Sequence, residues 1–236
     1  MQLLDTVSGR WYQVGERIVP SVTTILNVLH KPMLTEWKLK QGYKSEVVVR
    51  EALKVGDVVH DVLCRLTNGE EVELEDYYHI SGKDVWINDE ILKAITSAVE
   101  WFKEVELRVV ATEIELSHPE IGWAGTCDLV CKIKNKKGVW ERWLIDYKTS
   151  KQLDNDTLPH QLTAYTLLWN ARYPDEPIDK VGGLHCKKAW VKKPSATLKR
   201  YKINESLWKA VYTIFEAQNN KPRVRYDGPR VFSLSA

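Results

Sequence analysis

The sequence lacks any long hydrophobic run. Within its 236 residues, no stretch approaches the ~20 consecutive apolar positions of a membrane-spanning helix. Residues 1–5 also lack the basic flank and long apolar segment of a signal peptide. We therefore expect a chain without a membrane span and, by default, a cytoplasmic location.

Cysteine is scarce and widely spaced. The four cysteines, Cys64, Cys127, Cys131 and Cys186, do not resemble the disulfide framework of a small secreted domain. We expect reduced thiols. Cys127 and Cys131 are four residues apart in an expected strand, so they should lie on one face with a gap between them, unlike a zinc knuckle. A metal or iron–sulfur role for them is therefore disfavoured.

The chain also lacks a marked charge of either sign. It has 34 basic and 32 acidic residues, for a net charge of +2. This balance neither indicates nor excludes a nucleic-acid partner, because phosphate binding depends on a local basic face. Repeats, low-complexity tracts and linkers are missing as well. We therefore expect one globular domain over residues 1–236, a length that a single large domain can reach.

The hydrophobic pattern changes period along the chain. A hairpin about Gly15 is expected first, followed by a helix with Ser21 as its N-cap. Helical spacing then covers residues 35–66, where Gly56 is expected to separate two helices. The later elements are expected as follows: a helix at 89–102, strands at 109–116, 125–133 and 140–148, a helix at 158–170, strands at 181–190 and 198–203, and a helix at 204–220.

This order predicts an α/β fold in which a mixed central sheet is flanked by helices. We expect residues 1–105 to be mainly helical, residues 106–220 to form the sheet core and residues 221–236 to be an irregular tail. A helix that joins two strands of one sheet should make a right-handed crossover.

Two apolar strands of the expected meander contain carboxylates. Asp128 lies in the second strand and Asp146 in the third, and an isolated buried carboxylate is costly unless a cation accompanies it. Carboxylate oxygens on adjacent strands suit Mg²⁺ or Mn²⁺. Lys148 is two positions after Asp146 and so shares its face. A simpler alternative is a partly exposed Asp146–Lys148 ion pair, with Asp128 capping a turn.

Asp128 followed by Asp146-x-Lys148 resembles the signature of the PD-(D/E)xK nuclease superfamily, with Cys127 at the position of the motif's proline. Gly56-x-x-x-His60 and Gln161-x-x-x-Tyr165 resemble motifs of the RecB-like branch, which includes Cas4 and AddB nuclease domains and mitochondrial genome maintenance exonuclease. The resemblance covers roughly residues 56–165. It implies a restriction-endonuclease-like core.

The resemblance also implies roles for individual residues. His60, Asp128, Asp146 and the main-chain carbonyl of Tyr147 would bind one or two Mg²⁺ or Mn²⁺ ions, while Lys148 would act on the attacking water. An acidic residue near Glu113 belongs to the active-site region of the family, and Glu115 is then a solvated neighbour. Without the other motifs, His60 would be interpreted as an ordinary histidine at a helix–sheet contact.

Further residues are candidates for substrate contact. Gln161 and Tyr165 share a helical face, which the resemblance directs at the lysine region and the nucleic-acid backbone; an ordinary amphipathic helix gives the same spacing. Thr149 and Ser150 could bind phosphate or simply end a strand. Three more candidates come from loops and a family-like N-terminal segment: Ser21, Thr23 and Trp123.

The sequence therefore predicts a metal-dependent deoxyribonuclease, with an exonuclease acting on DNA ends or single strands favoured by the RecB-like resemblance, in replication, recombination or repair. Cluster-bearing members of that branch hold iron and sulfur with four cysteines, one before the core and three near the C-terminus. This chain has none before Cys64 or after Cys186, so we expect no cluster. The alternatives are an inactive nucleic-acid-binding module, an endonuclease or ribonuclease of the same fold, and a metal-independent adaptor.

Overall fold

A five-stranded mixed sheet forms the centre of the molecule. The computed structural model describes residues 1–6, 8–153, 156–189, 195–218 and 221. The strand order is β10-β9-β8-β7-β6, and the strands are β6 (Leu107–Ser117), β7 (Ala124–Lys134), β8 (Trp140–Lys148), β9 (Lys180–His185) and β10 (Thr197–Tyr201). Strands β6, β7 and β8 form an antiparallel meander, β9 runs parallel to β8, and β10 is antiparallel to β9. The predicted α/β fold with a mixed sheet is confirmed.

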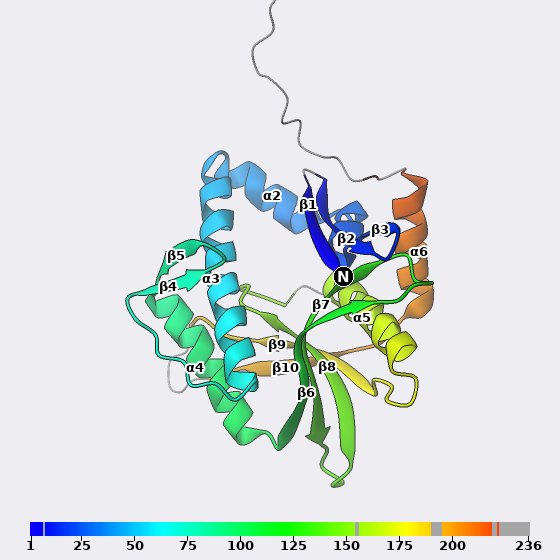
Figure 1. The fold of residues 1–236 in the computed structure, drawn as a ribbon. Helices are drawn as coiled ribbons and strands as arrows, with labels where there is room; N and C mark the ends of the chain where they lie inside the picture. Colours follow the sequence, from blue (N-terminus) through cyan, green and yellow to red (C-terminus); the bar gives the residue numbers. More distant parts are fainter. Residues whose placement is uncertain (7, 154–155, 190–194, 219–220, 222–236) are drawn as a thin grey trace, which may run out of the picture.

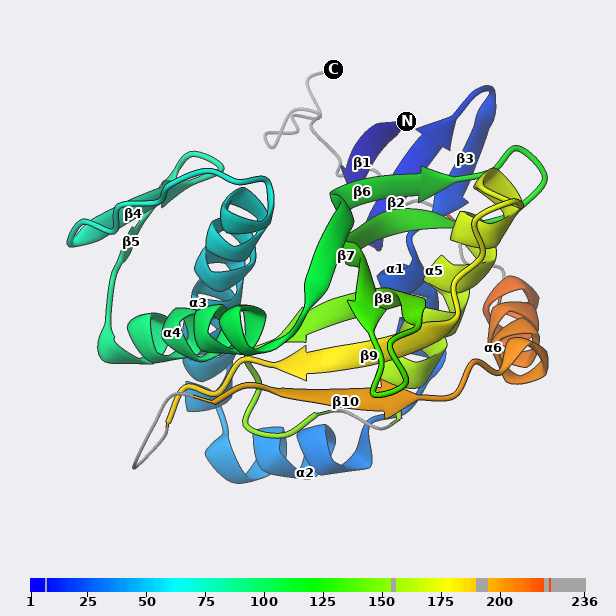
Figure 2. The same ribbon diagram turned by 90° about the horizontal axis from the view of Figure 1, so that it is seen from below.

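Helices cover both faces of this sheet (Figures 1 and 2). Helices α3 (Lys44–Thr67) and α4 (Asp89–Glu104) lie on one face, where their apolar residues pack with Leu129, Ile145 and Leu184. We call this the α3–α4 core. On the other face, α1 (Val22–Ile25), α5 (Leu158–Arg172) and α6 (Glu205–Ala217) pack with Val130 and Leu144. We call this the α5 core.

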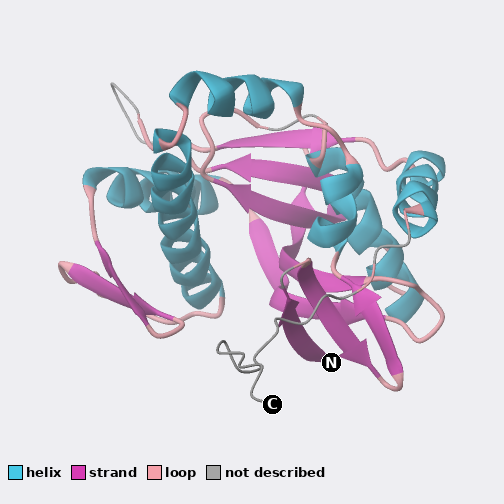
Figure 3. Ribbon diagram, turned by 90° about the horizontal axis from the view of Figure 1, so that it is seen from above, coloured by secondary structure: helices cyan, strands magenta, loops and turns pink. Residues whose placement is uncertain are grey.

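Short strands that the periodicity did not predict occur in the N-terminal part. Strands β1 (Gln2–Thr6), β2 (Gly9–Val14) and β3 (Arg17–Pro20) form a three-stranded sheet, and β4 (Tyr77–Ile80) pairs with β5 (Lys83–Trp86) in a hairpin beside α3 (Figure 3). Only the β2–β3 hairpin was expected. The other three strands have four or five residues with mostly exposed side chains, too short to give a clear alternation. The expectation that residues 1–105 are mainly helical is therefore incomplete.

Helix α3 is continuous, contrary to the expected break at Gly56. The chain instead breaks at Gly42, whose φ of 57° belongs to the left-handed region, between α2 (Pro32–Gln41) and α3. A 3₁₀ turn, η1 (Leu26–Val28), precedes α2. Glycine lowers helix propensity without forbidding a helix, and the apolar stripe of α3 outweighs its cost. Gly56 therefore lies within a regular helix, where it has no side chain to pack.

Two glycines should respond oppositely to alanine. In Gly56→Ala the new Cβ would lie 3.6 Å from Thr149 Oγ1, an ordinary contact, so we expect a gain of about 0.5–1 kcal/mol from helix propensity. In Gly125→Ala the Cβ would lie 2.7 Å from Tyr165 Cε1, and we expect a loss of about 1–3 kcal/mol from overpacking. Urea unfolding measures both, and a destabilised Gly56→Ala variant would contradict this account.

Strands β6 and β7 exchange faces at the same pair of residues. Cys127 and Val130 of β7 both pack in the α5 core although they are three positions apart, and so do Ala111 and Ile114 of β6. A regular strand places such residues on opposite faces. The β6–β7 register includes Thr112 with Leu129 and Ile114 with Cys127 but omits the pair between them. That pair is Glu113 and Asp128, and Figure 2 shows β6 bending along its length.

The bend corrects one expectation about the cysteines. Cys127 packs in the α5 core, whereas Cys131 packs in the α3–α4 core, so the two do not share a face. All four cysteines are free. The side chains of Cys127 and Cys131 therefore do not converge on a common site.

Most other expected elements are confirmed with small shifts of their ends. Ser21 and Asn204 cap α1 and α6 as predicted, through bonds from the N–H groups of Thr24 and Leu207. Strand β9 ends at His185, and residue 190 lies outside the described residues, as does the expected tail from 222 to 236. Within the described ranges, no helix combines the length and the apolar character needed to cross a membrane.

Candidate active site

Three of the predicted site residues lie close together where β6 and β7 bend. His60 lies on α3, Glu113 on β6 and Asp128 on β7. One ligand atom from each of these three side chains lies within 4.8 Å of the others. We call these residues the three-residue cluster. Three elements that are distant in sequence thus place an imidazole and two carboxylates around one point.

Asp128 and His60 are held by main-chain contacts with Tyr147 on β8. The N–H of Tyr147 donates to Asp128 Oδ2 at 2.6 Å, and His60 Nε2 lies 3.0 Å from the Tyr147 carbonyl. His60 Nδ1 lies 3.4 Å from Asp128 Oδ2. His60 was weighed as an ordinary histidine at a helix–sheet contact, and it does bridge α3 and β8. It also contacts the buried carboxylate, which such a histidine need not do.

Asp146 and Lys148 lie beside the three-residue cluster and contact α5. Lys148 Nζ lies 2.6 Å from Asp146 Oδ2. Gln161 donates from Nε2 to Asp146 Oδ1 at 2.8 Å, and its Oε1 lies 3.5 Å from Lys148 Nζ. Asp146 is only 2% exposed, whereas the Lys148 side chain is 28% exposed, so the ion pair of the simpler alternative is present, with its carboxylate buried. Gln161 thus holds the Asp146 carboxylate and the Lys148 ammonium in a fixed relative position.

Tyr165 supports this arrangement from one helical turn beyond Gln161. Its hydroxyl accepts a hydrogen bond from Gln161 Nε2 at 3.4 Å, and its ring lies against Gly125. Tyr165 is buried. Its contacts are therefore those of a residue that orients Gln161, and of these two residues Gln161 is the better placed for substrate contact.

The site holds more negative charge than it can stabilise without a cation. Burial, together with the nearby Asp128, raises the pKa of Glu113 to about 7. Burial also raises the pKa of Asp146 to about 6, against the opposing effect of Lys148. Burial alone would lower the pKa of His60, but Asp128 outweighs it and raises that pKa to about 9. Without a metal ion, bound protons on these side chains thus compensate the negative charge that a metal ion would otherwise compensate.

Comparison with known proteins agrees with this geometry. A family model described as the PD-(D/E)XK nuclease superfamily matches residues 35–219. The chain belongs to that superfamily. Membership implies a nuclease that depends on divalent metal ions, and the matched region contains the three-residue cluster, Asp146 and Lys148.

Two further comparisons add little to the family match. A solved structure described as "Crystal structure of SSO0001" has 18% sequence identity and a TM-score of 0.40, covering 89% of this chain and 81% of that chain. No curated protein matches the sequence.

The donor atoms fit the divalent metal of a PD-(D/E)XK nuclease. The three-residue cluster offers two carboxylates and an imidazole, and the Tyr147 carbonyl lies next to His60. Mg²⁺ and Mn²⁺ prefer oxygen ligands, and Mn²⁺ accepts an imidazole beside them. Asp146, implied as a ligand by the sequence motif, lies against Lys148 instead of within the cluster. Among the described side chains, His60, Glu113 and Asp128 therefore form the set whose donor atoms lie within 4.8 Å of one another.

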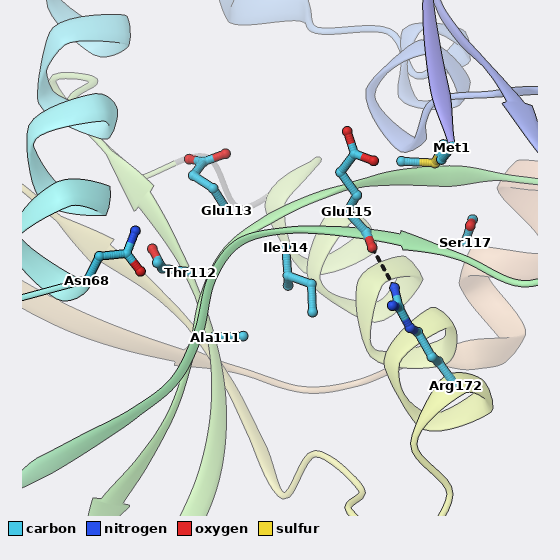
Figure 4. A pocket seen from close by; sticks show the side chains of 9 residues that line it. All are labelled: Met1, Asn68, Ala111, Thr112, Glu113, Ile114, Glu115, Ser117 and Arg172. Carbon is cyan, nitrogen blue, oxygen red and sulfur yellow. Dashed lines mark hydrogen bonds between the residues drawn. The ribbon is translucent and has the colours of Figure 1, made fainter.

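Glu113 has an unusual backbone and borders an open pocket. Its φ is 43°, in the left-handed region that costs a residue with a side chain roughly 1–3 kcal/mol. The pocket measures about 680 Å³ and is lined by Met1, Asn68, Ala111, Thr112, Glu113, Ile114, Glu115, Ser117 and Arg172 (Figure 4). Of the three-residue cluster, Glu113 is the member that lines this pocket. Asn68 and Arg172 carry no motif, and the sequence did not indicate them.

Glu113 and Glu115 provide a matched comparison, because both line the pocket but only Glu113 belongs to the cluster. We expect Glu113→Gln to weaken Mn²⁺ binding by at least roughly 10–100-fold, the range known for residues that only orient a metal ligand. Glu115→Gln should leave it unchanged. Calorimetric titration with Mn²⁺ measures both, and equal affinities in the two variants would remove Glu113 from the metal site.

Three proposed substrate contacts are not supported by the structure. Trp123 is 8% exposed, and its Nε1 donates to the Ala164 carbonyl in the α5 core; its aromatic surface is used in packing, which does not favour substrate contact. Ser21 is likewise buried and caps α1. Thr23 Oγ1 lies 3.0 Å from Ser21 Oγ, so this hydroxyl takes part in the hydrogen bonds that cap α1.

Thr149 and Ser150 lie just beyond Lys148, as expected. Thr149 is near Gly56 of α3. Ser150 is exposed, and its hydroxyl donates to the Gln152 carbonyl at 2.6 Å. Both remain candidates for phosphate contact at the end of β8.

Proposed function

We propose that the chain is a divalent-metal-dependent deoxyribonuclease of the RecB-like branch, acting as an exonuclease on DNA ends or single strands. The observation that carries this proposal is the convergence of the three-residue cluster with the Asp146–Lys148–Gln161 group. The RecB-like assignment is supported by Gly56-x-x-x-His60 and Gln161-x-x-x-Tyr165, because His60 and Gln161 both contact the site.

The chemistry follows from these positions. Bound Mg²⁺ or Mn²⁺ would supply a Lewis acid and a water of lowered pKa. His60, Glu113 and Asp128 would hold it. Lys148 would orient the attacking water or stabilise charge on the phosphate, since its ammonium lies at the carboxylate of Asp146. Gln161 would keep that ammonium and carboxylate aligned.

A digestion experiment tests the proposal. Single- and double-stranded linear DNA, labelled at either end, would be incubated with Mg²⁺, Mn²⁺ or EDTA beside closed circular DNA and a matched RNA. We expect metal-dependent release of label from linear DNA, intact circles and intact RNA, and loss of activity in Lys148→Ala. Cleaved circles would identify an endonuclease, and digested RNA a ribonuclease.

An inactive nucleic-acid-binding module is the second candidate, and the site argues against it. Such a module needs neither Asp146 nor Lys148, yet both are present in contact at 2.6 Å. Binding of DNA without cleavage under every metal condition would nevertheless support it. A role in replication, recombination or repair, a cytoplasmic location and the absence of an iron–sulfur cluster are part of the same proposal.

A further inference from the structure

One side chain outside the motifs connects all three elements of the cluster. The hydroxyl of Thr112, on β6, donates to the main-chain carbonyl of Asp128 on β7 at 3.1 Å. It also accepts from the hydroxyl of Thr67 on α3 at 3.0 Å. Strands β6 and β7 and helix α3 are the elements that carry Glu113, Asp128 and His60. Thr112 thus joins the supports of the three side chains.

Thr112 lies at the point where the pairing of β6 and β7 is irregular. It precedes Glu113, the residue with positive φ, and its hydroxyl bonds to Asp128 where the β6–β7 register omits a pair. A side-chain donor therefore holds the two strands together at the irregular point that carries both carboxylates.

Thr67 ties the same point to the helix. It lies seven residues after His60, two turns along one face of α3. Its hydroxyl also lies 2.8 Å from the Leu63 carbonyl and 3.0 Å from the Cys64 carbonyl of its own helix, so its single proton is shared between these acceptors and Thr112. The hydroxyl pair therefore opposes sliding or rotation of α3 against the strands, a movement that would carry His60 away from Asp128.

We propose that Thr112 is a positioning residue that holds His60, Glu113 and Asp128 at metal-binding distance, with Thr67 as its partner on α3. The inference rests on the proposed metal site. It assigns Thr112 no contact with metal or substrate. Removal of its hydroxyl should spread the three donors and weaken metal binding without unfolding the chain.

Titration of the metal-free protein with Mn²⁺ tests this inference. Valine keeps the shape of threonine without the hydroxyl, so Thr112→Val should bind Mn²⁺ about 10–100-fold more weakly, as for other residues that orient metal ligands. Thr112→Ser keeps the hydroxyl and should bind like the unaltered protein. Urea unfolding should stay cooperative in both variants, with the Thr112→Val midpoint lowered only by the modest contribution of a single hydrogen bond.

A second pair of variants separates positioning from general helix stability. Thr67→Val removes the partner hydroxyl, and we expect weaker Mn²⁺ binding again. Thr96→Val removes a comparable hydroxyl bond, from Thr96 Oγ1 to the Leu92 carbonyl in α4, and should leave Mn²⁺ binding unchanged.

The outcomes distinguish this inference from the proposed function. If the unaltered protein binds no Mn²⁺, the metal site and the proposed function fail. If it binds Mn²⁺ and Thr112→Val binds equally well, or Thr112→Ser is as weak as Thr112→Val, only the positioning role is overturned. Loss of cooperative unfolding in both Thr112→Val and Thr67→Val would also overturn it, by showing a purely structural role.

Discussion

Replacing Asp128 with asparagine should abolish metal-dependent cleavage while leaving the metal-free fold intact. Asparagine has the same shape, and its amide oxygen can still accept the 2.6 Å hydrogen bond from the Tyr147 N–H. The charge that would bind the metal is lost. Because metal ions contribute several kcal/mol of transition-state stabilisation, and about 1.4 kcal/mol corresponds to tenfold in rate, we expect a loss of about 10³-fold or more.

Two measurements check this expectation together. Cleavage of end-labelled DNA reports the reaction, and the melting temperature with and without Mn²⁺ reports binding, because a ligand of the folded state must stabilise it. Asp179→Asn is the matched control: the carboxylate of Asp179 also accepts a main-chain N–H, from Arg142 at 2.7 Å, but lies outside the cluster. An Asp128→Asn variant that still gains stability from Mn²⁺ would show that the metal binds elsewhere.

Replacing Lys148 with methionine should separate catalysis from metal binding. The ammonium contacts Asp146 and lies near Gln161 but supplies no metal ligand. We therefore expect cleavage to slow by about 10²–10⁴-fold, the usual contribution of a positioned proton-transfer group. Stabilisation by Mn²⁺ should persist, unlike in Asp128→Asn.

The control for Lys148 is another lysine of the central sheet. Lys180 on β9 lies 3.9 Å from Glu141 on β8, so Lys180→Met removes an ion pair between neighbouring strands without entering the site. We expect it to cleave DNA at the unaltered rate. Full activity in Lys148→Met would refute the assigned role, whichever way the metal behaves.

The central sheet was predictable because its signals are local. Residues 107–148 alternate or run apolar over nine to eleven positions per strand, long enough for the period to be recognised. The same rule missed β1 and the β4–β5 hairpin, which are short and exposed. The rule also predicted a helix break at Gly56 that does not occur, because a local stretch of sequence does not show how α3 packs on the sheet.

The site was predictable only in part. Asp128, Asp146 and Lys148 could be found because charges in apolar strands are costly, and the resemblance added His60 and Gln161. Neither route indicated Thr112, an ordinary strand residue until the Asp128 carbonyl approaches its hydroxyl. Trp123 was chosen because it lies in a loop beside a glycine, and a local window does not show that its ring packs against Trp208 of α6.

The exchange of faces at Glu113 and Asp128 has an evolutionary consequence. Inserting or deleting one residue on either strand there would turn the apolar side chains beyond it away from their core. Such length changes should be eliminated by selection for folding even in a relative that no longer cuts DNA. Related chains with this bend should therefore align without gaps through the pair, although the loops at both ends of these strands remain free to vary in length.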